Sequence, residues 1–235
     1  QKVGISGQLY GRRHDKDDAE PFDQDFGLLR GRWVNDLDGR QEIETGLELS
    51  QFRLDGEKYY NLLGLYSTYR YRSSDKLTWD MDLRVRDIAF EAEVNDYTYW
   101  SFQPGMQYQL SPRWRVDANL ALELESANED RLGGDAQIFG LHAKTRYALT
   151  SRHILEAGAQ YDRAGYQDEF PVGAAFNPQP EDRDENRYDV TLGWDWFPSQ
   201  DWRTRLEASY HKQDSSLDLY TYERTVGNFS VTRFF

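Results

Sequence analysis

Basic side chains two residues apart recur along this chain, and this spacing is the first feature that could do chemistry. Two such side chains lie on the same face when the chain is extended. A guanidinium group binds a carboxylate or a phosphate through two parallel hydrogen bonds. We therefore expect this set to bind anions: Arg30, Arg32, Arg70, Arg72, Arg84, Arg86, Lys144, Arg146, Arg203, Arg205 and Arg224.

Acidic residues alternate with these basic residues along the chain. Glu42, Glu44 and Glu48, for example, occupy the stretch between Arg32 and Arg70. Opposite charges on neighbouring strands attract each other when they lie directly across from one another. Two interpretations remain open and are compatible. The charges form a lattice of salt bridges, or an excess of unpaired guanidinium groups lines a path for anions.

A hydrolytic site would need a nucleophile, a base and a group that orients the base. Among the histidines, His211 has the best neighbours in sequence, with Asp214 to orient the ring and Ser215 or Ser216 as the nucleophile. No strong nucleophile motif surrounds them. We expect no catalytic residues, and hydrolysis remains an alternative.

The elements that must position these side chains are β-strands. In "YDVTLGWDW" (188–196), aromatic and aliphatic residues occupy every second position and polar residues or glycine fill the others, so one face is apolar and the other is wet. About twelve stretches alternate in this way, which predicts an all-β, up-and-down antiparallel barrel over the single domain 1–235. The predicted strands are 3–13, 26–35, 41–53, 59–72, 77–86, 98–110, 114–125, 139–149, 153–163, 188–196, 202–211 and 219–235.

Strand length and linker length both favour a membrane. Most of the predicted strands exceed the five or six residues typical of soluble proteins and match the 9–11 residues that a tilted strand needs to cross a bilayer. Every other link is short, whereas the intervening links include the longest segments, 14–25, 126–135 and 164–186. Transmembrane barrels alternate short turns with longer loops in this way. With an even number of strands, both termini lie at the short-turn end.

Tryptophans gather beside the short turns. Indole rings prefer the level of the lipid headgroups, where they form girdles around a barrel. We expect the girdle residues to be Trp33, Trp79, Trp114, Trp196, Trp202 and Phe235.

The overall charge excludes one class of partner. A net charge of -13 and an isoelectric point near 4.8 argue against nucleic-acid binding. With no cysteine there are no disulfides and no thiolate metal sites. We expect neither a cofactor nor a metal.

The end of the chain, "VGNFSVTRFF" (226–235), resembles the last strand of Gram-negative outer-membrane β-barrel proteins, which alternates and ends on phenylalanine. Gly227, Phe229, Val231 and Phe235 fall on its apolar face, and Arg233 departs from the pattern. The resemblance implies an integral protein of the bacterial outer membrane with both termini in the periplasm. It also implies contact with outer-membrane lipids and lipopolysaccharide, and recognition of the C-terminal strand by the barrel assembly machinery.

The basic inner face resembles that of small twelve-stranded channels for acidic oligosaccharides. This implies passive diffusion of small hydrophilic, anionic solutes such as acidic sugars or organic acids. A first alternative is an export or assembly barrel that passes polysaccharide or protein and is coupled to a helical-repeat periplasmic domain. The stretch "SSLDLYTYERTV" (215–226) resembles the last hairpin of such barrels through Tyr220, Tyr222 and Arg224. A second alternative is an outer-membrane lipid hydrolase.

Overall fold

The computed structural model describes residues 1–12, 23–128, 131, 133–172 and 179–234. Most of these residues are in strands, and the two helices are single 3-10 turns. The elements are β1 (Lys2–Arg12), β2 (Gln24–Asp36), β3 (Gln41–Leu54), β4 (Glu57–Arg72), β5 (Leu77–Phe90), η1 (Glu93–Asn95), β6 (Tyr97–Ser111), β7 (Trp114–Ala127), β8 (Ala136–Ala148), β9 (His153–Tyr166), β10 (Phe170–Val172), β11 (Gln179–Glu181), β12 (Asp184–Ser199), β13 (Trp202–Ser215), η2 (Asp218–Tyr220) and β14 (Tyr222–Arg233).

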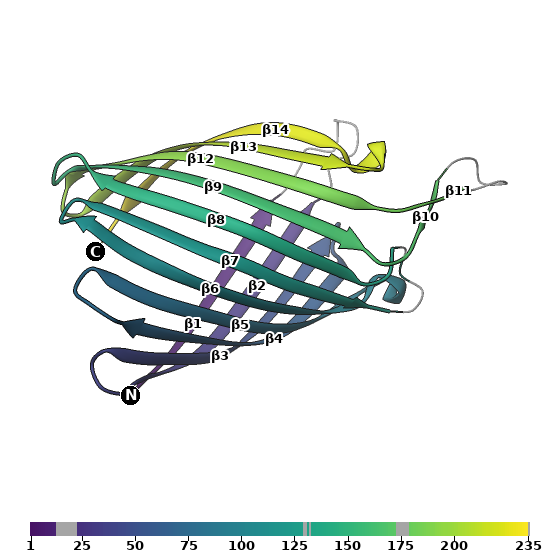
Figure 1. The fold of residues 1–235 in the computed structure, drawn as a ribbon, viewed down its shortest axis with the longest axis horizontal. Helices are drawn as coiled ribbons and strands as arrows, with labels where there is room; N and C mark the ends of the chain where they lie inside the picture. Colours follow the sequence, from purple (N-terminus) through teal and green to yellow (C-terminus); the bar gives the residue numbers. More distant parts are fainter. Residues whose placement is uncertain (13–22, 129–130, 132, 173–178, 235) are drawn as a thin grey trace.

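Twelve of the strands form one sheet, and each strand pairs antiparallel with the next strand of the sheet along the chain. Its order is β1 to β9, then β12, β13 and β14. The sheet curls so that β1 and β2 pass behind β6 to β8 in Figure 1. The prediction of an up-and-down antiparallel arrangement of twelve long strands is confirmed. The remaining strands, β10 and β11, form a small hairpin beyond the end of the wall.

The two ends of the barrel differ in their connections. Short turns join β2 to β3, β4 to β5, β6 to β7, β8 to β9 and β12 to β13, and β1 begins and β14 ends on the same side. We call this side the turn end and the opposite side the loop end. One connection at the loop end is also short, because Asp55 and Gly56 join β3 to β4 with positive φ angles of 51° and 82°. Two such residues form the tight turn that matches the natural twist of a hairpin.

The two faces of the sheet have opposite character. Large apolar side chains cover the outer face and are strongly exposed there, as Ile5 and Leu9 are at 80% and 91%. The inner face is polar, and its few buried apolar residues include Ile138 and Ala164. This arrangement is the inverse of a soluble protein and fits a wall that meets lipid on the outside. In the part of the chain that is described, no helix is long and apolar enough to cross a membrane.

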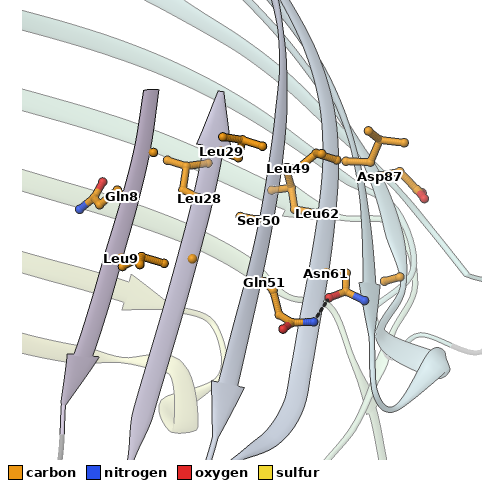
Figure 2. Close-up of a pocket in the computed structure, with 14 residues that line it drawn as sticks. Gln8, Leu9, Leu28, Leu29, Leu49, Ser50, Gln51, Asn61, Leu62 and Asp87 are labelled. Atoms are coloured by element: carbon orange, nitrogen blue, oxygen red, sulfur yellow. Dashed lines mark hydrogen bonds between the residues drawn. The ribbon is translucent and has the colours of Figure 1, made fainter. Parts of the chain in front are cut away.

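Polar side chains interrupt the apolar band of the outer face near the loop end of β3 and β4. A shallow hollow of about 960 Å³ lies across β1 to β5 (Figure 2). Gly7 and Gly27 help to form it, because glycine has no side chain. Leucines line most of its outer surface, but the Gln51 amide donates a hydrogen bond to Asn61 at 2.9 Å. These polar groups lie within a few residues of the loop end of β3 and β4.

The strands at the two edges of the sheet, β1 and β14, each have one partner. Within the described residues, β1 pairs with β2 and β14 pairs with β13, and no ladder joins β1 to β14. Almost every residue of both strands is exposed. The wall therefore has an open seam between its first and last strands.

Candidate functional site on the inner face

The predicted basic residues come together on the inner face. Each pair stands on one strand, and its alternation turns both side chains away from the exposed leucines. Arg30 and Arg32 stand on β2, Arg70 and Arg72 on β4, Arg84 and Arg86 on β5, Lys144 and Arg146 on β8, Arg203 and Arg205 on β13, and Arg224 on β14.

One group of charges is centred on Glu48 of β3. Its Oε2 accepts from Arg30 Nε at 3.2 Å, and its Oε1 accepts from Arg86 Nε at 2.5 Å. The register makes this possible, because Glu48 lies opposite Arg30 on one side and opposite Gly64 on the other, and Gly64 lies opposite Arg86. The absent side chain at Gly64 leaves the space through which Glu48 and Arg86 meet.

A second group lies on β8, β9, β12 and β13 toward the turn end. Asp195 accepts from Arg203 Nε at 2.9 Å and Nη2 at 3.0 Å, and from Arg205 Nη1 at 3.2 Å. Arg205 Nη1 also donates to Glu156 at 2.8 Å, and Lys144 Nζ lies 3.5 Å from the same carboxylate. Arg146 Nε lies 3.8 Å from the other oxygen of Glu156, so two acids hold four cations on this wall.

The acids and the cations of these groups differ in their exposure. The Glu48 side chain is 3% exposed, whereas that of Arg30 is 43% exposed. Asp195 is 1% exposed beside Arg203 at 35%. The carboxylates therefore lie against the wall, and the cationic groups extend over them toward the water of the interior.

Two of the predicted basic residues have no carboxylate partner among the described residues. The described residues provide ion pairs for the others, but Arg72 and Arg224 form none. Both are exposed. Most of the guanidinium charge is thus held in place by acids, and these two residues contribute unpaired charge.

The Arg183 guanidinium is packed among three aromatic rings at the loop end. Its guanidinium lies 4.2 Å from the ring centre of Tyr166, 5.0 Å from Phe170 and 3.5 Å from Tyr220. It also pairs with the fully buried Glu185. Cation–π contacts of this kind stabilise a rim where several segments meet. The described part of 164–186 therefore packs at the rim, and residues 173–178 of that segment lie outside the described residues.

The structure separates the groups that the sequence had linked around His211. Asp214 bonds to Lys212 at 2.8 Å on the outer face, and Ser215 accepts from the backbone of Leu217 in the next turn. His211 Nδ1 instead pairs with Asp189 across the ladder, and its Nε2 lies 3.1 Å from Ser209 Oγ. Ser209 was not among the predicted site residues, although its spacing of two residues from His211 places both on one face.

The predicted girdle residues cluster at the turn end. Trp33, Trp79, Trp114, Trp196 and Trp202 are all exposed on the outer face near that end. The Arg233 guanidinium lies 5.5 Å from the Trp202 ring, so this unexpected charge stacks on the girdle. Phe235 lies outside the described residues.

Metal chemistry finds no support on the described strands. No group of three or more histidine, aspartate or glutamate side chains within the described residues is arranged to hold an ion.

Comparison with known proteins links this architecture to outer-membrane barrels. No protein-family model matches the chain, and no curated protein matches its sequence. Several solved structures match its fold. Acinetobacter baumannii OccAB3 has a TM-score of 0.55 and 12% identity, with 99% of this chain and 65% of that chain covered. The Pseudomonas putida toluene transporter TodX has a TM-score of 0.54 and 12% identity, covering 99% and 78%. The NanC porin has a TM-score of 0.52 and 10% identity, covering 99% of both chains.

The fold is that of an outer-membrane β-barrel. At these identities the likeness establishes the fold alone. The evidence that bears on activity is the arrangement of charged side chains on the inner face.

Proposed function

We propose that this chain is an outer-membrane channel for passive diffusion of small, hydrophilic, anionic solutes. The observation that carries the proposal is the unequal exposure of the ion pairs. Acids such as Glu48 and Asp195 are buried against the wall, and their arginine partners face the interior water. A passing anion therefore meets guanidinium groups first, although the inner face also carries many carboxylates.

The buried acids serve to position the arginines. A guanidinium already held by Glu48 or Asp195 keeps its remaining N–H groups free for a solute, at little further cost in side-chain entropy. Arg30, Arg84 and Arg86 form one such wall, and Lys144, Arg203 and Arg205 form another. The solute exchanges part of its hydration shell for these donors and moves between weak sites without forming a covalent bond.

The fold neighbours include two kinds of transport protein. The NanC porin supports a hydrophilic pathway, whereas TodX transports toluene. An apolar cargo needs an apolar path. An apolar solute would have to pass the two groups of ion pairs around Glu48 and Asp195, so the inner face favours a hydrophilic cargo.

The outer face supports a location in the bacterial outer membrane. Its apolar band would contact lipid, and the tryptophan girdle at the turn end fits the inner headgroup layer. In this orientation both termini lie in the periplasm, the loop end meets lipopolysaccharide, and β14 is the strand offered to the barrel assembly machinery.

Reversal potentials in planar bilayers test the proposal. Across a tenfold KCl gradient, perfect selectivity gives about 59 mV, and we expect the wild type to reverse with the sign of an anion-preferring pore. Lys144→Glu and Arg224→Glu replace exposed cations of the inner face and should shift the potential toward cations. Arg163→Glu is the matched control, because Arg163 is exposed on the outer face.

Two results would contradict the proposal. The first is a folded protein, identified by its heat-shifted mobility on a gel, that does not conduct. The second is a cation-preferring wild type. A shift in Arg163→Glu as large as that in Arg224→Glu would contradict the inner-face explanation.

A further inference from the structure

Three side chains of β12 and β13 form a chain of contacts that the channel does not use. Ser209 Oγ lies 3.1 Å from Nε2 of His211, and Nδ1 of the same ring pairs with Asp189 Oδ1. The two ring nitrogens thus face different partners. When Nδ1–H donates to Asp189, Nε2 is the acceptor for the Ser209 hydroxyl. A nucleophile, a base and an orienting carboxylate are connected in the order that hydrolysis requires.

Regular strand geometry explains how these groups meet. Ser209 and His211 are two residues apart on β13, so both face the interior. Asp189 is the residue directly opposite His211 on β12. Three positions on two paired strands therefore fix the whole arrangement, without a loop that could move it. Sites built on strands are held more firmly than sites built on loops.

The surroundings leave room for a substrate. The side chains of His211 and Asp189 are 27% and 29% exposed. Asp189 and Thr191 line a hollow of about 270 Å³ on the inner face, together with Gly158, whose missing side chain widens it. The register places Thr191 opposite Ser209, so that a second hydroxyl lies beside the nucleophile.

Cationic groups lie on both sides of this arrangement. Arg224 of β14 is opposite His211, is exposed and forms no ion pair with the described residues. Lys144 lines the hollow on the other side and has a 54% exposed side chain. The acids Asp117, Glu156 and Glu207 also line the hollow, and Glu156 pairs with Lys144. Arg224 is therefore the cation left to hold a negatively charged substrate next to Ser209.

We propose that Ser209, His211 and Asp189 form a serine hydrolase site that cleaves esters of anionic solutes. Ser209 Oγ forms a bond with the ester carbonyl carbon while its proton passes to His211 Nε2. The carbon–alkoxy bond then breaks, and Nε2–H protonates the departing alcohol. Water attacks the acyl-serine and gives its proton to Nε2, and that proton returns to Ser209 as the acyl–oxygen bond breaks. The products are an alcohol and a carboxylic acid.

Each residue has a separate role in this scheme. Ser209 and His211 touch the reacting atoms and are catalytic residues. Asp189 acts through the imidazole and is a positioning residue. Arg224 and the Thr191 hydroxyl are the donors nearest by register for the negative charge that develops on the carbonyl oxygen.

A fluorophosphonate probe tests the nucleophile directly. Folded full-length protein in detergent should be labelled at Ser209, as mapped by mass spectrometry of the modified peptide. Ser209→Ala should abolish the labelling. Ser230→Ala is the matched control, because Ser230 is also on the inner face, opposite Arg205, and should retain full labelling. Heat-shifted gel mobility verifies that each variant is folded. Absence of labelling in the wild type, or labelling that persists in Ser209→Ala, overturns the proposal.

Hydrolysis of two nitrophenyl esters tests the other roles. His211→Gln should lower kcat by about 10²–10⁴-fold. Asp189→Asn should lower kcat over a similar range and leave KM within about twofold, which a loss of structure would not do. 4-Nitrophenyl hemisuccinate, which is anionic, should be cleaved faster than neutral 4-nitrophenyl acetate, and Arg224→Gln should remove this preference. Equal rates for both esters in the wild type overturn the anionic substrate class.

This inference and the proposed channel fail separately. A barrel that conducts anions but is not labelled overturns the hydrolase site alone. A barrel that is labelled at Ser209 but does not conduct overturns the channel alone.

Discussion

A methyl group added at Gly64 would test whether the Glu48 carboxylate holds the arginines of the inner face in position. In Gly64→Ala the new carbon would lie 2.7 Å from Glu48 Cγ, 2.9 Å from Glu48 Oε1 and 3.2 Å from Arg86 Cγ. The first two distances are too short for any real contact, so Glu48 has to move. Because its Cγ must shift, both of its bonds to the neighbouring arginines are lost.

The expected cost follows from the two consequences of that movement. Overpacking of a filled site costs about 1–3 kcal/mol. Loss of the partner of a fully buried charge costs about 3–5 kcal/mol, but Arg30 and Arg86 are 43% and 23% exposed and recover part of this from water. We therefore expect Gly64→Ala to lower the free energy of unfolding by about 2–4 kcal/mol.

A double-mutant cycle distinguishes displacement of Glu48 from a general effect of the substitution on the strand. The free energy of unfolding is measured by urea titration of the protein refolded into lipid vesicles. With the obstacle removed in Glu48→Ala, the further change Gly64→Ala should cost less than about 0.5 kcal/mol, which is the limit for independent sites. Gly158→Ala is the control, because its new carbon would meet only a backbone oxygen at 3.7 Å.

Three outcomes would refute the reasoning. Gly64→Ala could be neutral, its cost could be unchanged in the Glu48→Ala background, or Gly158→Ala could be equally harmful. Any of these would mean that Glu48 does not depend on the space at Gly64.

Other predictions concern the turns and the girdle. Gly56→Ala should lower the free energy of unfolding by about 1 kcal/mol, because φ is +82° there, and equilibrium urea unfolding would detect the change. Hydrogen bonds from the backbone of Arg40, and then from the Gln41 side chain, lower the pKa of Asp38 below its usual 3.8. Asp38 therefore stabilises the fold above its unfolded pKa, and this contribution disappears as the pH falls through the folded value. Asp38→Asn should flatten the pH dependence of unfolding below about pH 4, and an unchanged slope would count against this explanation. Arg233→Ala should cost about 0.5–1 kcal/mol through loss of the contact with Trp202, and Trp202→Leu should remove the effect of Arg233→Ala in the same urea titrations.

The sequence was sufficient to predict the faces of the wall, because alternation is a local property. Each of the predicted strands overlaps one strand of the sheet, and the basic residues spaced by two lie on one face as expected. The tight turn at Asp55 and Gly56 was not among the predicted short turns, because those were identified only at every other link. Its aspartate–glycine pair is nevertheless a recognised signal for a two-residue turn.

The partners of each side chain depended on register, which alternation does not fix. The partners predicted for His211 were residues that follow it in sequence. Asp214 is an odd number of positions away, so it lies on the outer face of the strand, opposite to His211. Asp189 is distant in sequence and meets His211 only because turn length sets the pairing of β12 with β13. The stack around Arg183 needed three separate segments and had no local signal.

The absence of a ladder between the described strands β1 and β14 has a consequence for the order in which the barrel assembles. Each strand of the sheet pairs only with the sheet strands that come before and after it along the chain, so the wall can form one hairpin at a time. A ladder between β1 and β14 would instead close a loop that includes almost the whole chain. This costs only about 2 kcal/mol more entropy than a hairpin, since the penalty grows logarithmically with length. An unpaired backbone group in hydrocarbon costs several kcal/mol, and each edge strand carries a row of them. Pairing of β1 with β14 therefore joins the two strands that are most distant in sequence and satisfies the unpaired backbone groups of both. It cannot begin until β14 (Tyr222–Arg233) has reached the bilayer beside β1.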